Sequence, residues 1–307
     1  MKPKIWTARV YRALQEIPWA MRPEKLDEIL AFLDAHAAGI RAFDDEPRRA
    51  AARSVSQRTG AVAVLPIIGL ISNRANMLSD FSGGTSLQVV VKDLRALVAD
   101  DTISAVVLEI DSPGGFVDGV EEFAAEVYAA RKTKTIVAVS NTMAASAAYW
   151  IAAAASEIVV SPSGEVGSIG VWMVHQDESG AWEAMGVKNT VIYAGKFKTA
   201  GNRFEPLSEE AQELLQGRID QTYASFVGAV AKGRGVTSKD VREGFGQGFI
   251  VGAKEAVKLG MADRVATLEE TIQRLQNARG RTNTARALVA AMGVRTVCSD
   301  GTRDPLE

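Results

Sequence analysis

The chain has 307 residues, and its 35 Lys and Arg nearly balance its 37 Asp and Glu, so its formal net charge is −2. This length suffices for one large domain or two smaller ones, and the charge balance does not favour a nucleic-acid-binding protein. The single cysteine, Cys298, cannot form a disulfide within the chain, which fits a reducing compartment. The sequence lacks a signal peptide at its start and the roughly 18-residue apolar run of a membrane span. We therefore expect a soluble cytoplasmic protein.

Residues 1–58 are predicted to form a helical appendage followed by a linker. Leucine and isoleucine recur at helical spacing in residues 23–38, and Pro23 suits the first turn of a helix. Residues 43–59 lose this pattern and carry many charges, which is typical of a solvated linker.

From Gly60 onward, predicted strands alternate with predicted helices. Apolar runs predict strands at 61–68, 105–110, 135–140, 158–161, 171–175 and 190–193. Helices are expected at 87–99, 117–131, 144–155, 207–232, 253–259 and 268–275. This alternation predicts an α/β domain over residues 59–275 with largely parallel strands, and the polar residues 276–307 are expected to form a disordered tail.

Ser146 is a candidate nucleophile because it follows a predicted strand and lies in a run of small residues, 141–155. At the start of a helix its hydroxyl can face a cleft, where the positive helix end favours nearby negative charge. The flanking alanines leave room for a substrate backbone. The alternative interpretation of this segment is a tightly packed alanine-rich helix in which Ser146 has no chemical role.

Lys198 is the candidate base, because the chain has only two histidines, His36 and His175. A neutral lysine can activate a serine when burial lowers the lysine pKa. Lys198 follows a predicted strand and stands two residues after Lys196. The alternative is that both lysines belong to a solvated surface.

Residues 111–115, Asp-Ser-Pro-Gly-Gly, end an apolar strand. Gly114 and Gly115 permit a backbone conformation that exposes N–H groups, as an oxyanion hole requires, although an ordinary turn has the same composition. In residues 164–171, Ser168 can hold a lysine amine by a hydrogen bond, or the segment is a simple loop. No His, Cys and carboxylate cluster has metal-ligand spacing, so we predict neither a metal nor another cofactor.

Together and in order, five segments resemble the SppA-type (signal peptide peptidase A) family of serine peptidases, relatives of ClpP within the crotonase-like fold. The segments are 111–115, 143–149, 166–171, 195–198 and 252–263. The resemblance covers residues 60–265 and implies repeated ββα units, with the predicted helical appendage in front of them. Family members often have glycine at the positions of Ala147 and Ala148, and many have aspartate at Thr199, so this chain departs from the family there.

The resemblance implies a serine endopeptidase that works without ATP through a Ser–Lys dyad. Ser146 would be the nucleophile and Lys198 the general base, with Ser168 orienting the lysine amine. The backbone N–H groups of Gly114 and Ala147 would form the oxyanion hole, with Gly115 in support.

Residues 17–25 resemble the phage and prophage branch of the family, the head-maturation or minor capsid proteases. This branch implies capsid, scaffold or portal proteins as substrates, and a location in the host cytoplasm or the procapsid. Relatives form ring-like or dome-like oligomers, so the resemblance further implies a homo-oligomer. The membrane anchor of some family members is not expected here, and the charge balance predicts no nucleic-acid partner.

Three alternatives remain open at this stage. The first is a soluble host peptidase of the same family that degrades signal peptides or other peptide fragments. The second is a non-catalytic structural protein associated with the capsid. The third is an acyl-CoA enzyme of the crotonase-like fold, which would explain the glycine turn but not Ser146, Ser168 and Lys198 together.

Overall fold

The computed structural model describes residues 18–21, 57–74 and 84–278. These residues form two sheets with helices packed against them, which confirms the predicted α/β class. The larger sheet has the strand order β11-β10-β8-β6-β3-β2, with β9 on β8 and β12 on β9. Its strands are β2 (Gln57–Thr59), β3 (Val62–Ile68), β6 (Ala105–Ser112), β8 (Thr135–Ala145), β9 (Glu157–Val160), β10 (Glu165–Gly167), β11 (Ile250–Gly252) and β12 (Arg264–Val265).

A smaller sheet has the strand order β1-β7-β4-β5. It is made of β1 (Trp19–Met21), β4 (Ile71–Ser72), β5 (Thr85–Ser86) and β7 (Gly114–Phe116). The helices are α5 (Leu87–Ala99), α6 (Val120–Ala130), α7 (Ala147–Ala153), α8 (Ser179–Ala184), α9 (Glu209–Arg234), α10 (Ser238–Gly244), α11 (Ala253–Lys258) and one over residues 268–278, with a 3₁₀ turn η1 (Gly246–Gly248).

The predicted ββα repeat is present twice. β3 and β6 are parallel neighbours in the larger sheet. β3 is followed by β4 and β5 of the smaller sheet and then by α5, and β6 is followed by β7 and then by α6. β8 continues the parallel order beside β6 and leads directly into α7. This arrangement brings the carboxyl ends of β6 and β8 to one edge of the sheet.

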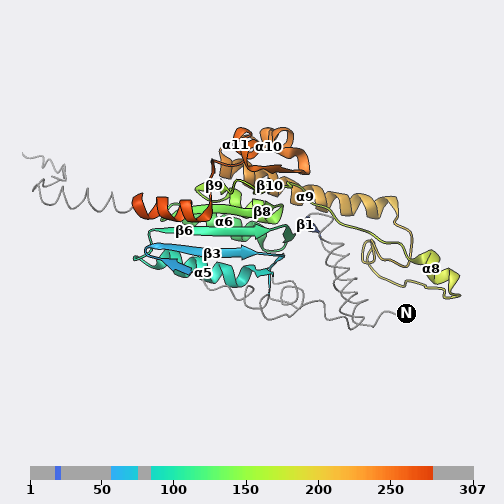
Figure 1. The fold of residues 1–307 in the computed structure, drawn as a ribbon. Coiled ribbons are helices and arrows are strands. Elements are labelled where there is room, and N and C mark those ends of the chain that lie inside the picture. The colour runs from blue at the N-terminus through green and yellow to red at the C-terminus, as the bar shows by residue number, and fades with distance from the viewer. Residues whose placement is uncertain (1–17, 22–56, 75–83, 279–307) are drawn as a thin grey trace, which may run out of the picture.

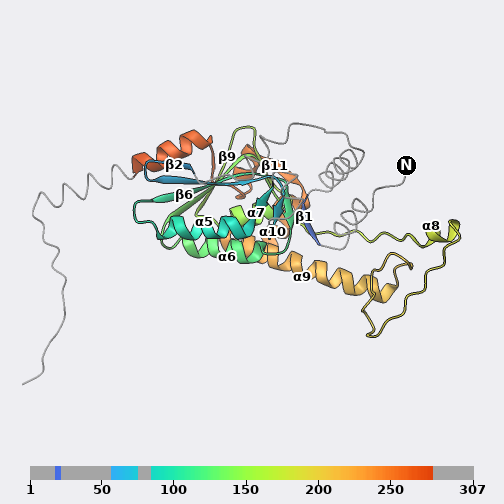
Figure 2. The same cartoon turned by 90° about the horizontal axis from the view of Figure 1, so that it is seen from below.

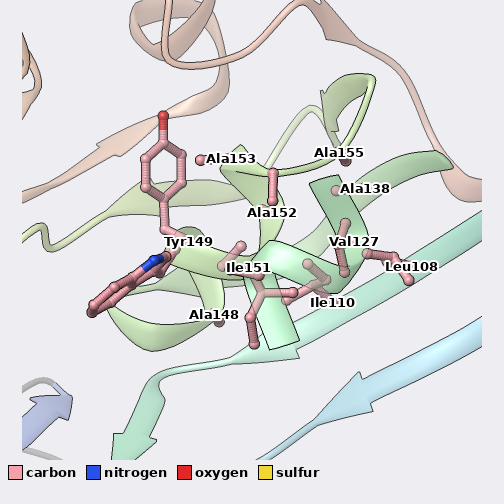
Figure 3. Close-up of a cluster of buried hydrophobic side chains, with 14 of the residues drawn as sticks. Leu108, Ile110, Val127, Ala138, Ala148, Tyr149, Ile151, Ala152, Ala153 and Ala155 are labelled. Atoms are coloured by element: carbon pink, nitrogen blue, oxygen red, sulfur yellow. The ribbon is translucent and has the colours of Figure 1, made fainter. Parts of the chain in front are cut away.

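Both faces of the larger sheet are covered, because the side chains of each strand alternate between two cores. On one face, residues such as Leu108, Ile110 and Ala138 pack against α6 and α7 (Figure 3). On the opposite face, Val107 and its neighbours pack against the helix over residues 268–278. Figure 2 shows α5 and α6 side by side on the first face, and α9 extends from the end of α6 away from the sheets. β3, β6 and β8 are therefore buried on both of their faces.

Two predicted strands are absent from the structure. Residues 171–175 form only an isolated bridge at Trp172, and residues 190–193 form no strand. Instead, the chain between β10 and α9 extends away from the sheets with the short α8 near its tip (Figures 1 and 2). The apolar side chain of Ile192 is 92% exposed there. On this extension no neighbouring strand is available to pair with an apolar run. The strands predicted at 171–175 and 190–193 from their apolar residues were therefore wrong.

The β8–α7 junction also differs from its prediction. β8 continues through Ala145, because residues 143–145 pair in parallel with β10. The helix predicted from residue 144 therefore begins at Ala147.

Parts of the predicted appendage belong to the α/β body. Trp19, Ala20 and Met21 are at most 1% exposed and form β1 of the smaller sheet, and β2 pairs antiparallel with β3. The predicted helix at 23–38 and most of the predicted linker lie outside the described residues, as does the predicted tail from residue 279 onward. Within the described ranges, no helix is long and apolar enough to cross a membrane.

Candidate active site

Ser146 occupies a strained turn between β8 and α7. Its backbone has a φ of 55° and a ψ of −118°, a conformation that residues other than glycine rarely adopt. Such a conformation costs about 1–3 kcal/mol and is held only by the surrounding structure. Here the Ser146 N–H donates to the Gly167 carbonyl at 2.7 Å, and the Ser146 carbonyl accepts from the Trp150 N–H at 2.9 Å. A strained strand-to-helix turn is a recurrent way to present a nucleophilic serine.

The Ser146 hydroxyl is buried and only weakly held. The residue is 1% exposed, and among the described residues its Oγ makes one long contact, at 3.5 Å, to the Gly170 carbonyl. A buried hydroxyl without a strong partner is available to an incoming base or carbonyl group.

Ser168 lies on the strand next to Ser146. Gly167, which ends β10, pairs with Ala145 in parallel register, and Ser168 follows it with a φ of 55°. The Ser168 N–H donates to the Phe249 carbonyl at 2.9 Å, and the residue is 9% exposed. Thus two serines with unusual backbone conformations stand at the carboxyl ends of neighbouring parallel strands.

Gly114 closes the other side of the site. A Cβ at this position would lie 3.0 Å from the Ser146 Cβ and 2.2 Å from the Ala20 carbonyl oxygen, and the φ of 101° also favours glycine. The Gly114 N–H donates to Ser112 Oγ at 3.1 Å, and the Ser112 hydroxyl donates to the Gly69 carbonyl at 2.7 Å. The N–H predicted for the oxyanion hole therefore has a side-chain partner in this structure.

The remaining predicted oxyanion residues border the same place. Ala147 is the fully buried first residue of α7, and N–H groups in the first turn of a helix have no acceptor within the helix. Gly115 follows in β7, where a Cβ would lie 2.0 Å from the Ile71 carbonyl oxygen. The structure thus gathers Ser146, Ala147, Ser168 and the two glycines into one site.

Lys198 does not lie with these residues at the Ser146 site. It lies exposed on the extension between β10 and α9, where it lines an open pocket of about 400 Å³ together with His175 and Arg218. Neither Ser146 nor Ser168 lines this pocket. Across the described ranges, no hydrogen bond or ion pair involves the Lys198 ammonium group, whereas Lys196 forms an ion pair with Glu210 at 3.1 Å. The chain alone does not assemble the predicted dyad.

Two tryptophans at the site were not among the predicted site residues, although Trp19 lies in the segment 17–25 and Trp172 in the strand predicted at 171–175. Trp172 exchanges two backbone hydrogen bonds with Trp19, at 2.8 and 3.0 Å, and its indole N–H donates to the Met21 carbonyl at 2.6 Å. Ser112 was likewise overlooked, although it lies within the Asp-Ser-Pro-Gly-Gly segment that suggested the oxyanion hole. β1, which contains Trp19, has three residues and is too short for a periodic pattern of apolar residues to reveal it.

Comparisons with known proteins identify the family. Residues 129–281 match the sequence model of peptidase family S49. The chain is 32% identical over 235 residues to capsid assembly protease C of Escherichia phage lambda, covering 76% of this chain and 52% of that protein. It is 31% identical over 200 residues to a putative protease of Synechocystis sp., covering 65% of this chain and 71% of that protein. The chain belongs to peptidase family S49, and the predicted SppA-type resemblance is confirmed.

A solved structure is also similar. A mutant of ClpP1 from Listeria monocytogenes matches with a TM-score of 0.43 and 17% identity, over 67% of this chain and 92% of that one. The chain spans about half the length of the phage lambda relative.

Proposed function

We propose that this protein is a serine endopeptidase, with Ser146 as its nucleophile, that acts without ATP. The observation that carries the proposal is the strained conformation of Ser146 beside the side-chain-free backbone of Gly114. This pairing leaves room for a peptide backbone next to a weakly held hydroxyl. Membership of peptidase family S49 supports the same reaction class.

In the proposed mechanism, Ser146 Oγ attacks the carbonyl carbon of a peptide bond and gives its proton to the neutral amine of Lys198. The N–H groups of Gly114 and Ala147 stabilise the negative oxygen that forms. For Gly114 this requires its N–H to exchange the Ser112 hydroxyl for the oxyanion. The lysine then protonates the leaving amine, and an acyl-enzyme remains on Ser146.

Water completes the reaction. Lys198 removes a proton from the attacking water, the ester bond to Ser146 breaks, and the serine oxygen regains its proton as the carboxylic acid product leaves. Ser168, beside Ser146, would hold the lysine amine between the two steps.

The lysine must come from a neighbouring copy of the chain in this proposal. Lys198 lies on an extension that leaves the body of the molecule (Figures 1 and 2), and Ile192, Tyr193 and Phe197 on the same segment are 43–92% exposed. Clustered exposed apolar side chains mark surfaces that bind a partner. A homo-oligomer would cover them and carry Lys198 to the Ser146 site of another subunit.

The proposed substrates are capsid, scaffold or portal proteins of a phage. The capsid assembly protease of phage lambda supports this choice, since it is similar over 76% of this chain. A second candidate is a peptidase of the same family that degrades peptide fragments, since the similar protein of Synechocystis sp. is named a putative protease without reference to a capsid. Either role is compatible with the host cytoplasm.

Co-expression with phage coat, scaffold and portal proteins, the proposed substrates, tests the proposal. We expect the wild type to cleave at least one of these proteins, as detected by mass spectrometry. Ser146→Ala and Lys198→Ala should each lower the cleavage rate about 10³-fold or more, since removing one member of a catalytic unit nearly abolishes its contribution. Lys196→Ala is the matched control and should retain activity.

Cleavage that survives both substitutions would refute the dyad. Cleavage of added casein, but of none of the co-expressed proteins, would favour the peptide-degrading role. If a phosphonate probe fails to label Ser146 in the wild type and no protein is cleaved, the non-catalytic structural alternative holds.

A further inference from the structure

β1 is a short segment held by backbone hydrogen bonds on both of its sides. On one side it pairs antiparallel with β7, with Ala20 opposite Gly115. On the other side Trp19 exchanges two backbone hydrogen bonds with Trp172, and the Trp172 indole N–H donates to the Met21 carbonyl. Proteins that bind extended peptides hold them by this kind of strand addition.

This segment lies directly beside the proposed nucleophile. A Cβ placed on Gly114 would meet the Ala20 carbonyl oxygen at 2.2 Å and the Ser146 Cβ at 3.0 Å, so all three groups surround one small volume. A substrate strand that brought its carbonyl group to Ser146 would need the same edge of β7. β1 therefore occupies the place of such a strand, between β7 and Trp172, and this place is called the groove below.

The β1 side chains fill this groove closely. Trp19 stacks on Phe116 with the ring centroids 4.3 Å apart, and Ala20 is fully buried. Met21 is 1% exposed. The groove thus accommodates an aromatic residue, a small residue and a long unbranched apolar residue in succession.

The contacts of β1 differ from those that the proposed cleavage would need. The Met21 carbonyl accepts from the Trp172 indole, and the Gly114 N–H donates to Ser112. The donor proposed to stabilise an oxyanion is therefore engaged elsewhere while β1 is in place. This geometry is that of an inhibitor rather than of a substrate about to react.

We infer that β1 is an internal occupant of the substrate groove, which inhibits the peptidase until the segment is displaced. This inference rests on the proposed function, because it takes the Ser146 site as the place of cleavage. It also specifies the substrate class: extended peptides with an aromatic residue, then a small residue, then a long apolar residue, in the positions that Trp19, Ala20 and Met21 occupy.

The test uses full-length Ser146→Ala protein, so that binding is measured without catalysis. The probe is a fluorescein-labelled peptide with the sequence of residues 15–24, and its binding is followed by fluorescence anisotropy. Ala20→Asp places a charge in the groove and should displace β1. We expect it to bind the peptide at least about tenfold more tightly than the parent, because removing a competing internal occupant raises the fraction of open sites. Val89→Asp, a substitution at a position that is 54% exposed on α5, is the control and should bind like the parent.

Trp19→Ala is a second variant that removes the stacking on Phe116 without adding charge, so the test does not depend on one substitution. Unlabelled peptide of the same sequence should compete with the probe, and a scrambled peptide should not. Equal binding by the parent, Ala20→Asp and Trp19→Ala would overturn the inference.

With Ser146 intact, Ala20→Asp and Trp19→Ala should also hydrolyse casein faster than the wild type. Tighter peptide binding without hydrolysis in any variant would support the internal occupant and refute the proposed peptidase. Hydrolysis by the wild type that neither variant increases, together with unchanged binding, would refute the occupant and leave the peptidase standing.

Discussion

Single glycines determine how closely the backbone can approach at the candidate site. Gly115 is the clearest case, because a Cβ there would lie 2.0 Å from the Ile71 carbonyl oxygen, and a backbone atom of a neighbouring strand cannot easily move away. We expect Gly115→Ala to lower the free energy of unfolding by about 1–3 kcal/mol or more, as overpacking does. Urea unfolding measures this. Gly244→Ala is the control, since no described residue outside its own helix backbone lies within 4 Å of the added Cβ. A loss of stability as large for Gly244→Ala would contradict the steric explanation.

Asp263 contributes to the stability of the fold in a way that depends on pH. Burial raises its pKa, but hydrogen bonds from Arg234 and from the Ile158 N–H outweigh burial, and the pKa lies below its ordinary value. Both Arg234 contacts are 2.8 Å long, and the Ile158 N–H lies 2.7 Å from the carboxylate. Since the folded pKa is lower than the unfolded one, the ionised carboxylate stabilises the fold above the ordinary value of 3.8. This stabilisation is lost as the pH falls through the lower, folded pKa.

Asp263→Asn should therefore lower the Tm at pH 7. The expected loss is about 1–2 kcal/mol, at the lower end for a charged hydrogen bond because the Asp263 side chain is 40% exposed and solvent screens it. The difference from the wild type should shrink when the pH is lowered below about 4. Calorimetry at several pH values measures it, with the exposed Asp101→Asn as the control. A difference that stays constant down to pH 2 would exclude ionisation of Asp263 as its cause.

The sequence indicated half of the candidate site by residue type alone. Gly114 and Ser146 follow strands that were predicted, at 105–110 and 135–140, and these strands are parallel neighbours in the sheet. Ser168 follows β10, which was not predicted, and lies beside Ser146 because β10 pairs with β8. Lys198 was found as a residue type, but its distance from Ser146 depends on an extension that no local pattern describes. Trp19 and Trp172 were missed, because their pairing joins segments 153 positions apart through single hydrogen-bonded positions.

At the scale of elements, the longest helices were predicted best. The prediction of 87–99 agrees with α5, and α9 begins after Ser208, whose hydroxyl accepts from the Ala211 N–H at 3.2 Å. Helices of this length carry a clear period, whereas β10 and β11 have three residues each and each ends in glycine. Short strands are specified by their neighbours in the sheet rather than by their own residues.

The contact between α9 and α7 gives a prediction at this scale. Phe226 of α9 stacks on Trp150 of α7 with the ring centroids 4.6 Å apart, and a Cβ on Gly233 would lie 1.9 Å from the Ala153 carbonyl oxygen. The glycine lets the two helices come together where α7 ends. We expect Gly233→Ala to destabilise the fold by about 1–3 kcal/mol, because the added methyl group must push the helices apart.

Gly228 in the same helix is a matched control, since nothing in the described ranges beyond its own helix backbone lies within 4 Å of an added Cβ. Gly228→Ala should stabilise the protein by about 0.5–1 kcal/mol, because alanine has the higher helix propensity. Thermal unfolding of both variants measures this contrast. If both substitutions stabilise the protein, the close contact between α7 and α9 is not present in solution.

At the scale of the whole molecule, the separation of Lys198 from Ser146 makes the oligomer part of the proposed chemistry. A single chain offers a serine site without its base, and an exposed lysine that none of the described residues engages. If the two residues come from different copies, one subunit can supply what another lacks. Symmetric homo-oligomers make this arrangement repeat at every interface.

Mixing two inactive variants tests this arrangement. Ser146→Ala and Lys198→Ala proteins should each be inactive alone, and a 1:1 mixture allowed to reassemble should regain on the order of a quarter of the wild-type activity. This fraction follows because each site draws its serine and its lysine at random from two different copies. Casein hydrolysis and light scattering measure activity and assembly on the same samples. A mixture of the double variant Ser146→Ala/Lys198→Ala with Lys198→Ala contains no functional lysine and should remain inactive. If wild type is active but the first mixture stays inactive although its subunits exchange, both residues must act within one chain, and the extension would then have to fold back onto the Ser146 site.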